Sequence, residues 1–81
     1  MTPGEKLEIL IDYDLFGLNI KGLHGIYIDK TPKTEKLLIY IEENGEWAEL
    51  LEEQVKRTKP GKVSKKNKEF ISRVRKLGFS E

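Results

Sequence analysis

The sequence predicts a mainly β protein with a C-terminal α-helix, in which five strands form a small barrel. Apolar and polar residues alternate in several short segments before residue 58, which is typical of half-buried strands. An Asn-Gly pair separates two of these segments, and apolar residues recur at helical spacing after residue 64. With 81 residues, the chain is long enough for one domain and too short for two.

The first two strands are predicted from period-two alternation. Leu7, Ile9 and Ile11 alternate with other residues over residues 6–13. The next segment, residues 14–25, contains three glycines and is too interrupted for a helix, so it forms a long first loop. The sequence HGIYIDKT at residues 24–31 then alternates again and gives the second strand.

A hairpin is predicted in the middle of the chain. After a Thr-Pro turn signal, residues 37–41 form an apolar third strand. Asn44 and Gly45 predict a two-residue type I′ turn, because that turn needs positive φ at both central positions. A fourth strand over residues 46–51 follows.

Residues 46–57 leave two interpretations open. On the strand interpretation, residues 52–54 make a tight turn and residues 55–58 form a short closing strand. On the helix interpretation, the segment EWAELLEEQVKR has high helix propensity. Its apolar residues also fit helical spacing: Trp47, Leu50, Leu51 and Val55.

The C-terminal segment predicts an amphipathic helix. Ser64 is a suitable N-cap, and Gly78 is placed to end the helix. Four apolar residues share one helix face: Phe70, Ile71, Val74 and Leu77. We therefore expect residues 1–58 to form the barrel, residues 59–63 a linker, and residues 64–78 a basic helix packed on the barrel or extending from it.

Charge is divided unevenly along the chain. The net charge is +1, but residues 1–55 carry 5 basic and 12 acidic side chains, a net −7, and residues 56–81 carry 10 basic and 2 acidic ones, a net +8. The basic segment predicts a surface that binds a polyanion or an acidic partner, unless this segment lies against the acidic part of its own chain. The basic side chains are Lys56, Arg57, Lys59, Lys62, Lys65, Lys66, Lys68, Arg73, Arg75 and Lys76.

Residues suited to catalysis or metal binding are scarce, so we expect a non-enzymatic protein without a metal or cofactor. The absence of cysteine excludes disulfides, thiolate metal sites and thiol nucleophiles. A Ser-His-Asp triad would need His24, the only histidine. Asp12 and Asp14 have the spacing of a carboxylate pair on one strand face, as acid–base catalysis would require. The simpler interpretation is that both carboxylates are solvated where the strand enters the loop.

An acidic group surrounds the predicted fourth strand. Charged residues on an edge strand discourage aggregation between sheets, and they would equally suit the basic patch of a partner. The six glutamates are Glu42, Glu43, Glu46, Glu49, Glu52 and Glu53.

Four motifs together resemble the SH3-like small barrels: TPGEKLEI, KGLHGIYI, ENGEW and LLEEQVKR. Over residues 3–58 the chain resembles accessory proteins of photosynthetic electron transport, namely the E-type small subunit of photosystem I, the ferredoxin-thioredoxin reductase variable chain and the S subunit of the photosynthetic NDH complex. The resemblance implies a non-catalytic docking module in which the K-G-x-x-G step at residues 21–25 turns the chain into the second strand. The sequence departs from these families in its C-terminal helix and its acidic barrel.

The resemblance also implies binding through aromatic residues beside the first long loop. The candidates for protein binding are Phe16, Trp47, Tyr13 and Tyr27. Of these, we expect Phe16 and Trp47 to be exposed, where they could stack on a ligand instead of filling the core.

The sequence favours a protein–protein interaction module, a small docking subunit of a larger photosynthetic or redox complex. The alternative is a small nucleic-acid-binding protein that uses residues 56–76. No stretch approaches the roughly 18 apolar residues of a membrane span, so we expect a soluble cytoplasmic protein, or one of the plastid stroma, without membrane binding. Self-association through the oppositely charged segments stays open.

Overall fold

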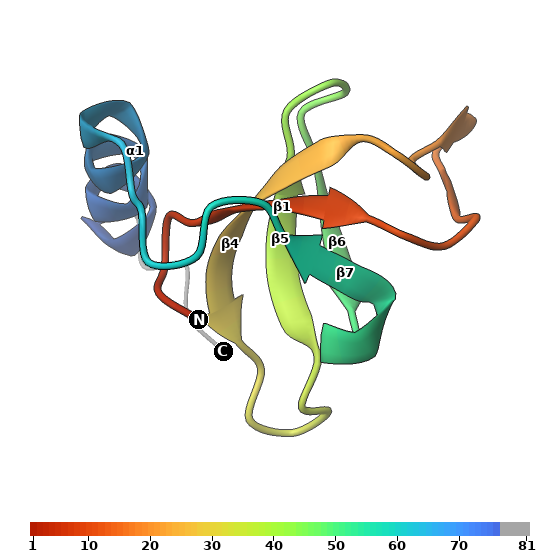
Figure 1. The fold of residues 1–81 in the computed structure, drawn as a ribbon, viewed down its shortest axis with the longest axis horizontal. Coiled ribbons are helices and arrows are strands. Elements are labelled where there is room, and N and C mark those ends of the chain that lie inside the picture. Colours follow the sequence, from red (N-terminus) through yellow and green to blue (C-terminus); the bar gives the residue numbers. More distant parts are fainter. Residues whose placement is uncertain (77–81) are drawn as a thin grey trace.

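Five antiparallel strands form the main sheet of the computed structural model, which describes residues 1–76 (Figure 1). The strands are β1 (Lys6–Ile9), β4 (His24–Lys30), β5 (Leu37–Ile41), β6 (Glu46–Leu50) and β7 (Val55–Arg57). Their order is β6-β5-β4-β1-β7, so β1 lies between β4 and the last strand of the chain. The predicted mainly β fold with a C-terminal helix is confirmed. Within the described residues the sheet is open, with β6 and β7 as its edges.

The predicted long loop contains a small hairpin of β2 (Asp14–Leu15) and β3 (Leu18–Asn19). Its two-residue turn consists of Phe16, with φ 52°, and Gly17, with φ 87°. Positive φ at both positions is the signature of a type I′ turn. The first strand ends at Ile9 instead of residue 13, because the chain leaves the sheet there to enter this hairpin.

The hairpin between β5 and β6 differs from its prediction. Ile41 pairs with Glu46, which leaves a four-residue loop over residues 42–45. Gly45 has φ 68°, but Asn44 is not among the residues with positive φ, so the predicted type I′ turn at this point is wrong. The Asn44 side chain instead accepts a hydrogen bond from the Glu46 amide (3.1 Å) within the longer loop. Four-residue hairpin loops are most often built around a type I turn, which does not need positive φ at its central residues.

The strand interpretation of residues 46–57 is confirmed. After β6 the chain makes a single 3-10 turn, η1 (Glu52–Gln54), and continues into β7. The Gln54 side chain accepts a hydrogen bond from the Leu51 amide (2.8 Å) and so closes this turn. Ala48 and Leu50 alternate into the core of the sheet, and this burial outweighs the helix propensity of the segment.

The K-G-x-x-G step contains two glycines, and each position favours glycine for a different physical reason. Gly22 has φ 82° in the turn that leads into β4, a conformation that residues with a side chain rarely adopt. Gly25 is buried within β4, where an added Cβ would lie 2.4 Å from the side chain of Ile39. This close approach lets β4 and β5 pack side chains tightly on the same face.

The two central strands, β4 and β5, bury apolar residues on both faces. One face, together with the β2–β3 loop, forms the larger core: Leu7, Ile9, Leu15, Ile20, Tyr27, Leu37, Ile39, Ile41, Ala48, Leu50 and Val55. The other face carries Ile26, Ile28 and Leu38. These residues pack against Ile71 and Val74 of the C-terminal helix. Continuous apolar runs such as LLIYI are typical of strands that are covered on both sides.

The C-terminal helix, α1 (Lys65–Lys76), covers the second face through Ile71 and Val74. Ser64 is its N-cap, as predicted, because its Oγ accepts a hydrogen bond from the Asn67 amide (3.1 Å). The predicted Leu77 contact and Gly78 stop lie outside the described residues. Over residues 1–76, no helix has the length and apolar character needed to cross a membrane.

Val74→Asp tests whether the helix is part of the folded core. Val74 is 6% exposed among the apolar residues of the second sheet face. An aspartate there buries an unpaired charge and removes apolar contacts, so we expect a loss of about 2–4 kcal/mol of unfolding free energy in urea denaturation. Ser72→Asp, on the exposed side of α1, introduces the same charge and is expected to leave stability nearly unchanged. Equal effects of the two substitutions would show that the helix does not contribute to the core.

Candidate binding surfaces

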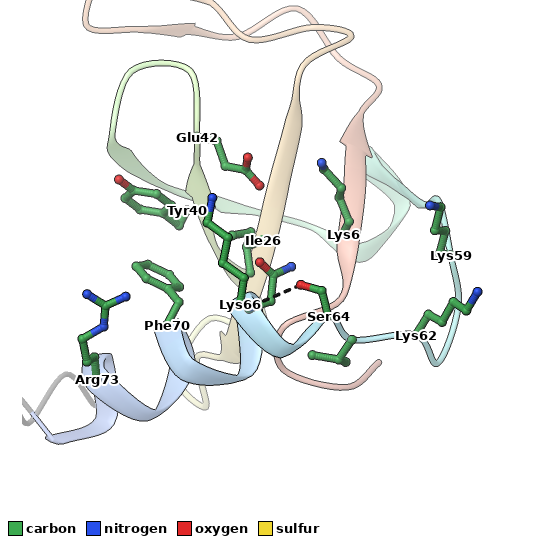
Figure 2. A pocket seen from close by; sticks show the side chains of 12 residues that line it. Lys6, Ile26, Tyr40, Glu42, Lys59, Lys62, Ser64, Lys66, Phe70 and Arg73 are labelled. Atoms are coloured by element: carbon green, nitrogen blue, oxygen red, sulfur yellow. Dashed lines mark hydrogen bonds between the residues drawn. The ribbon is translucent and has the colours of Figure 1, made fainter.

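A groove of about 790 Å³ lies where α1, the preceding linker and the sheet meet (Figure 2). Its volume is within the roughly 300–1,000 Å³ range of ligand sites. Five basic side chains line it: Lys6, Lys59, Lys62, Lys66 and Arg73. Glu42 is the one acidic residue in its lining. The remaining lining residues are apolar, aromatic or small polar ones, so positive charge dominates the groove.

Aromatic residues form the apolar side of this groove. Tyr40 from β5 and Phe70 from α1 lie side by side there, with ring centroids 4.9 Å apart and planes tilted by 44° (Figure 2). Trp47 of β6 also stacks with Phe70, with ring centroids 6.4 Å apart and planes inclined by 16°. All three residues are half-buried, so they contribute to helix packing and still present ring surface to solvent.

The linker that carries Lys59 and Lys62 is held in place by the buried carboxylate of Glu5. One carboxylate oxygen accepts hydrogen bonds from Nε of Arg57 (2.9 Å) and the amide of Gly61 (3.1 Å). Arg57 also contributes its Nη2, at 2.9 Å from the same oxygen. The other carboxylate oxygen accepts a hydrogen bond from the Thr2 amide. A single side chain thus joins the N-terminus, β7 and the linker.

The pKa of Glu5 reflects two opposing effects. Burial raises the pKa, because Glu5 is 0% exposed and its charged form loses hydration. The backbone hydrogen bonds from Thr2 and Gly61 and the interaction with Arg57 together outweigh burial, and they lower the pKa from 4.5 to about 2. The carboxylate is therefore charged at neutral pH inside the fold.

Two further hydrogen bonds attach the basic segment to the N-terminal strand. The Asn67 side chain on α1 donates to the carbonyl of Gly4 (2.9 Å). The Thr58 hydroxyl donates to the carbonyl of Lys6 (3.0 Å). These contacts bring Lys6, at the start of the chain, beside lysines more than fifty residues later.

The structure divides the basic residues that the sequence singled out. Lys59, Lys62, Lys66 and Arg73 meet in the groove, and Arg57 pairs with Glu5. The others are exposed outside the groove lining: Lys56, Lys65, Lys68, Arg75 and Lys76. Among residues 1–76, the Glu5–Arg57 contact is the one ion pair that joins the basic segment to the acidic part of the chain. Apart from Arg57, the basic side chains of the described segment therefore form no ion pair with the acidic part of the chain.

A second surface lies on and beside the β2–β3 hairpin. The exposed large hydrophobic residues of the described chain all lie within residues 10–18: Leu10, Tyr13, Phe16 and Leu18. We call these four residues the hairpin surface. Phe16, at the tip, is 82% exposed. The two remaining aromatic candidates do not join this surface, since Tyr27 is only 6% exposed in the core and Trp47 is half-buried beneath α1 rather than exposed as predicted.

The base of the hairpin is tied by polar contacts. Nδ2 of Asn19 donates to Asp12 (3.1 Å), while its side-chain oxygen accepts from the amide of Lys21 (3.1 Å). The bond from Asn19 and the nearby charge of Lys21 lower the pKa of Asp12. Asp12 thus holds the loop in shape, which favours the structural interpretation of the Asp12 and Asp14 pair over an acid–base role.

The other candidates from the sequence are dispersed. Glu46 and Glu49 lie on the edge strand β6, where their charge opposes pairing with another sheet. His24 is exposed at the start of β4. Within residues 1–76, no group of three or more acidic or histidine side chains is placed to hold a metal ion.

Comparisons with protein-family models, curated proteins and solved structures found no match to this chain. Functional inference therefore depends on the two surfaces. Sequence reasoning missed Lys6, Tyr40 and Glu42 as groove residues, and it gave Phe70 packing on the barrel as its default role, with docking into a partner groove or a membrane interface left open. The signal that was available for Tyr40 is its spacing of two from Leu38, which places both on the helix-facing side of β5.

Stability should depend on the charge of Glu5. Because its pKa is lower in the folded chain, its contribution is fully present above pH 4.5 and is lost as the pH falls toward 2. We expect a decline of roughly 2–3 kcal/mol across this range, measured by urea denaturation at each pH.

Glu5→Gln should lower stability at pH 7 and flatten the decline between pH 5 and pH 2. Asp12→Asn is the control, because Asp12 is exposed and its replacement should leave the acid-dependent decline in place. If the Glu5→Gln protein kept the pH dependence of the original chain, Glu5 would not be the source of the loss of stability in acid.

Proposed function

We propose that this chain is a non-enzymatic docking module that binds another protein of a larger assembly through the hairpin surface. The observation that carries the proposal is the concentration of the exposed large hydrophobic residues of the described chain in residues 10–18. Exposed hydrophobic residues scattered over a surface are ordinary, whereas their concentration within residues 10–18, on and beside one hairpin, favours an interaction site. Aromatic anchors such as Phe16 and Tyr13 commonly dominate the binding energy of such sites.

The backbone of Phe16 supports the same proposal. Its φ of 52° is unfavourable for a residue with a bulky side chain, and type I′ turns prefer asparagine or aspartate followed by glycine. An 82% exposed phenylalanine recovers little of this cost through packing. Strain that gives the fold nothing in return points to a contact made outside the chain.

The strand arrangement supports an SH3-like module. β1 lies between β4 and the closing strand, a long first loop precedes β4, and a single 3-10 turn precedes β7. The resemblance of residues 3–58 to accessory proteins of photosynthetic electron transport points to the same arrangement and to a partner within a multi-subunit complex. The SH3-like families bind through aromatics beside the first long loop, which is where the hairpin surface lies.

The first test locates the partner. A photo-crosslinking amino acid at position 16 should capture one protein in cells of the source organism, and the same amino acid at position 33, on the loop between β4 and β5, should not. The captured protein is then purified and its affinity for the unmodified chain is measured. Capture of a second copy alone would replace this proposal with self-association.

Phe16→Asn should separate stability from docking. Asparagine tolerates positive φ, so we expect about 0.5–1 kcal/mol of added stability, while affinity for the purified partner falls at least tenfold. Glu35→Asn is the matched control, because Glu35 has φ 57° on another loop and its replacement relieves similar strain without touching the hairpin surface. Unchanged affinity in Phe16→Asn would overturn the proposal.

A further inference from the structure

We infer that the basic groove binds single-stranded nucleic acid, at a site separate from the hairpin surface. The inference combines two properties of the same groove, its five basic side chains and its aromatic side. Proteins that bind single strands without sequence preference use this combination, in which cations follow the phosphates and rings stack on bases.

The basic side chains are distributed around the groove. Lys66 and Arg73 extend from α1, and Lys59 and Lys62 lie on the linker across from Arg73 (Figure 2). Within residues 1–76, none of the five basic lining residues takes part in an ion pair. Their charge is therefore available to a ligand, opposed in the groove lining only by Glu42. A chain of phosphates could contact the linker and the helix at the same time.

The aromatic side distinguishes a single strand from a duplex. Tyr40 and Phe70 are half-buried and expose part of their rings beside Lys66 (Figure 2). Bases in a duplex are stacked on each other and inaccessible to these rings, whereas a single strand offers both its phosphates and its base faces. An acidic peptide would satisfy the cations without needing the rings.

The groove and the hairpin surface are spatially separate. In Figure 1, α1 lies at one end of the longest axis and the β2–β3 hairpin lies toward the other end. The two lining sets share no residue. Failure of nucleic-acid binding would therefore leave the proposed protein docking unaffected, and the reverse also holds.

The first experiment measures fluorescence anisotropy of labelled oligothymidine and oligouridine of about 12 nucleotides, and of a duplex of the same length, from about 50 to 200 mM salt. We expect single strands to bind at least tenfold more tightly than the duplex. With four phosphate contacts, the slope of log affinity against log salt should be about −3, since each contact on a single strand contributes about −0.7. Trp47, the only tryptophan, stacks with Phe70 and should change its fluorescence on binding.

Two sets of variants separate charge from stacking. Lys62→Ala with Lys66→Ala should weaken binding about tenfold and make the salt slope shallower by about 1.4. Lys30→Ala with Lys33→Ala removes the same charge outside the groove and should have little effect. Phe70→Leu keeps an apolar contact for the helix but removes the ring, so affinity should fall about tenfold with the slope unchanged. Thermal unfolding confirms that each variant is folded.

Four results would overturn the inference. They are an absence of binding at 50 mM salt, equal affinity for duplex and single strand, unchanged affinity in Phe70→Leu, and equally effective competition by poly-glutamate. The last result would assign the groove to an acidic protein instead, and the second would leave only nonspecific attraction between charges.

Discussion

The buried carboxylate of Glu5 is the interaction on which the arrangement of this protein depends. It accepts hydrogen bonds from Thr2, at the N-terminus, and from Arg57 and Gly61, which follow more than fifty residues later in β7 and the linker. A buried charge is unfavourable unless it is paired and fully hydrogen-bonded, so the carboxylate specifies where each of the three segments must lie. The position of the linker, and with it one wall of the groove, follows from this contact.

The second constraint is the double-sided burial of β4 and β5. Because Ile26, Ile28 and Leu38 face away from the larger core, the sheet needs α1 to cover them. The helix and the sheet therefore form one folding unit. Covering this face also brings Phe70 beside Tyr40 and creates the aromatic side of the groove.

Local sequence signals predicted the elements better than their contacts. The alternation of Leu7 and Ile9 and the N-cap at Ser64 each determine local structure, and each was recognised in the sequence. The turn types were not recognised. Asn44 adopts the backbone conformation that its four-residue loop requires, and Phe16 adopts the positive φ that the β2–β3 pairing requires. The surroundings of Glu5 could not be predicted from the sequence either. Nothing in the sequence distinguishes Glu5 from the other acidic residues, 14 in all, or indicates that it is buried and paired with Arg57.

The structure extends 31 Å along its longest axis, and the two proposed binding surfaces lie toward opposite ends of that axis (Figure 1). With both surfaces occupied, the protein would act as a spacer that holds a strand near a docked partner without flexible linkage. Such tethering raises the effective local concentration of one ligand around the other, provided that the geometry lets both surfaces be occupied at once. Weak binding in the groove would then suffice to place a strand beside the docked partner.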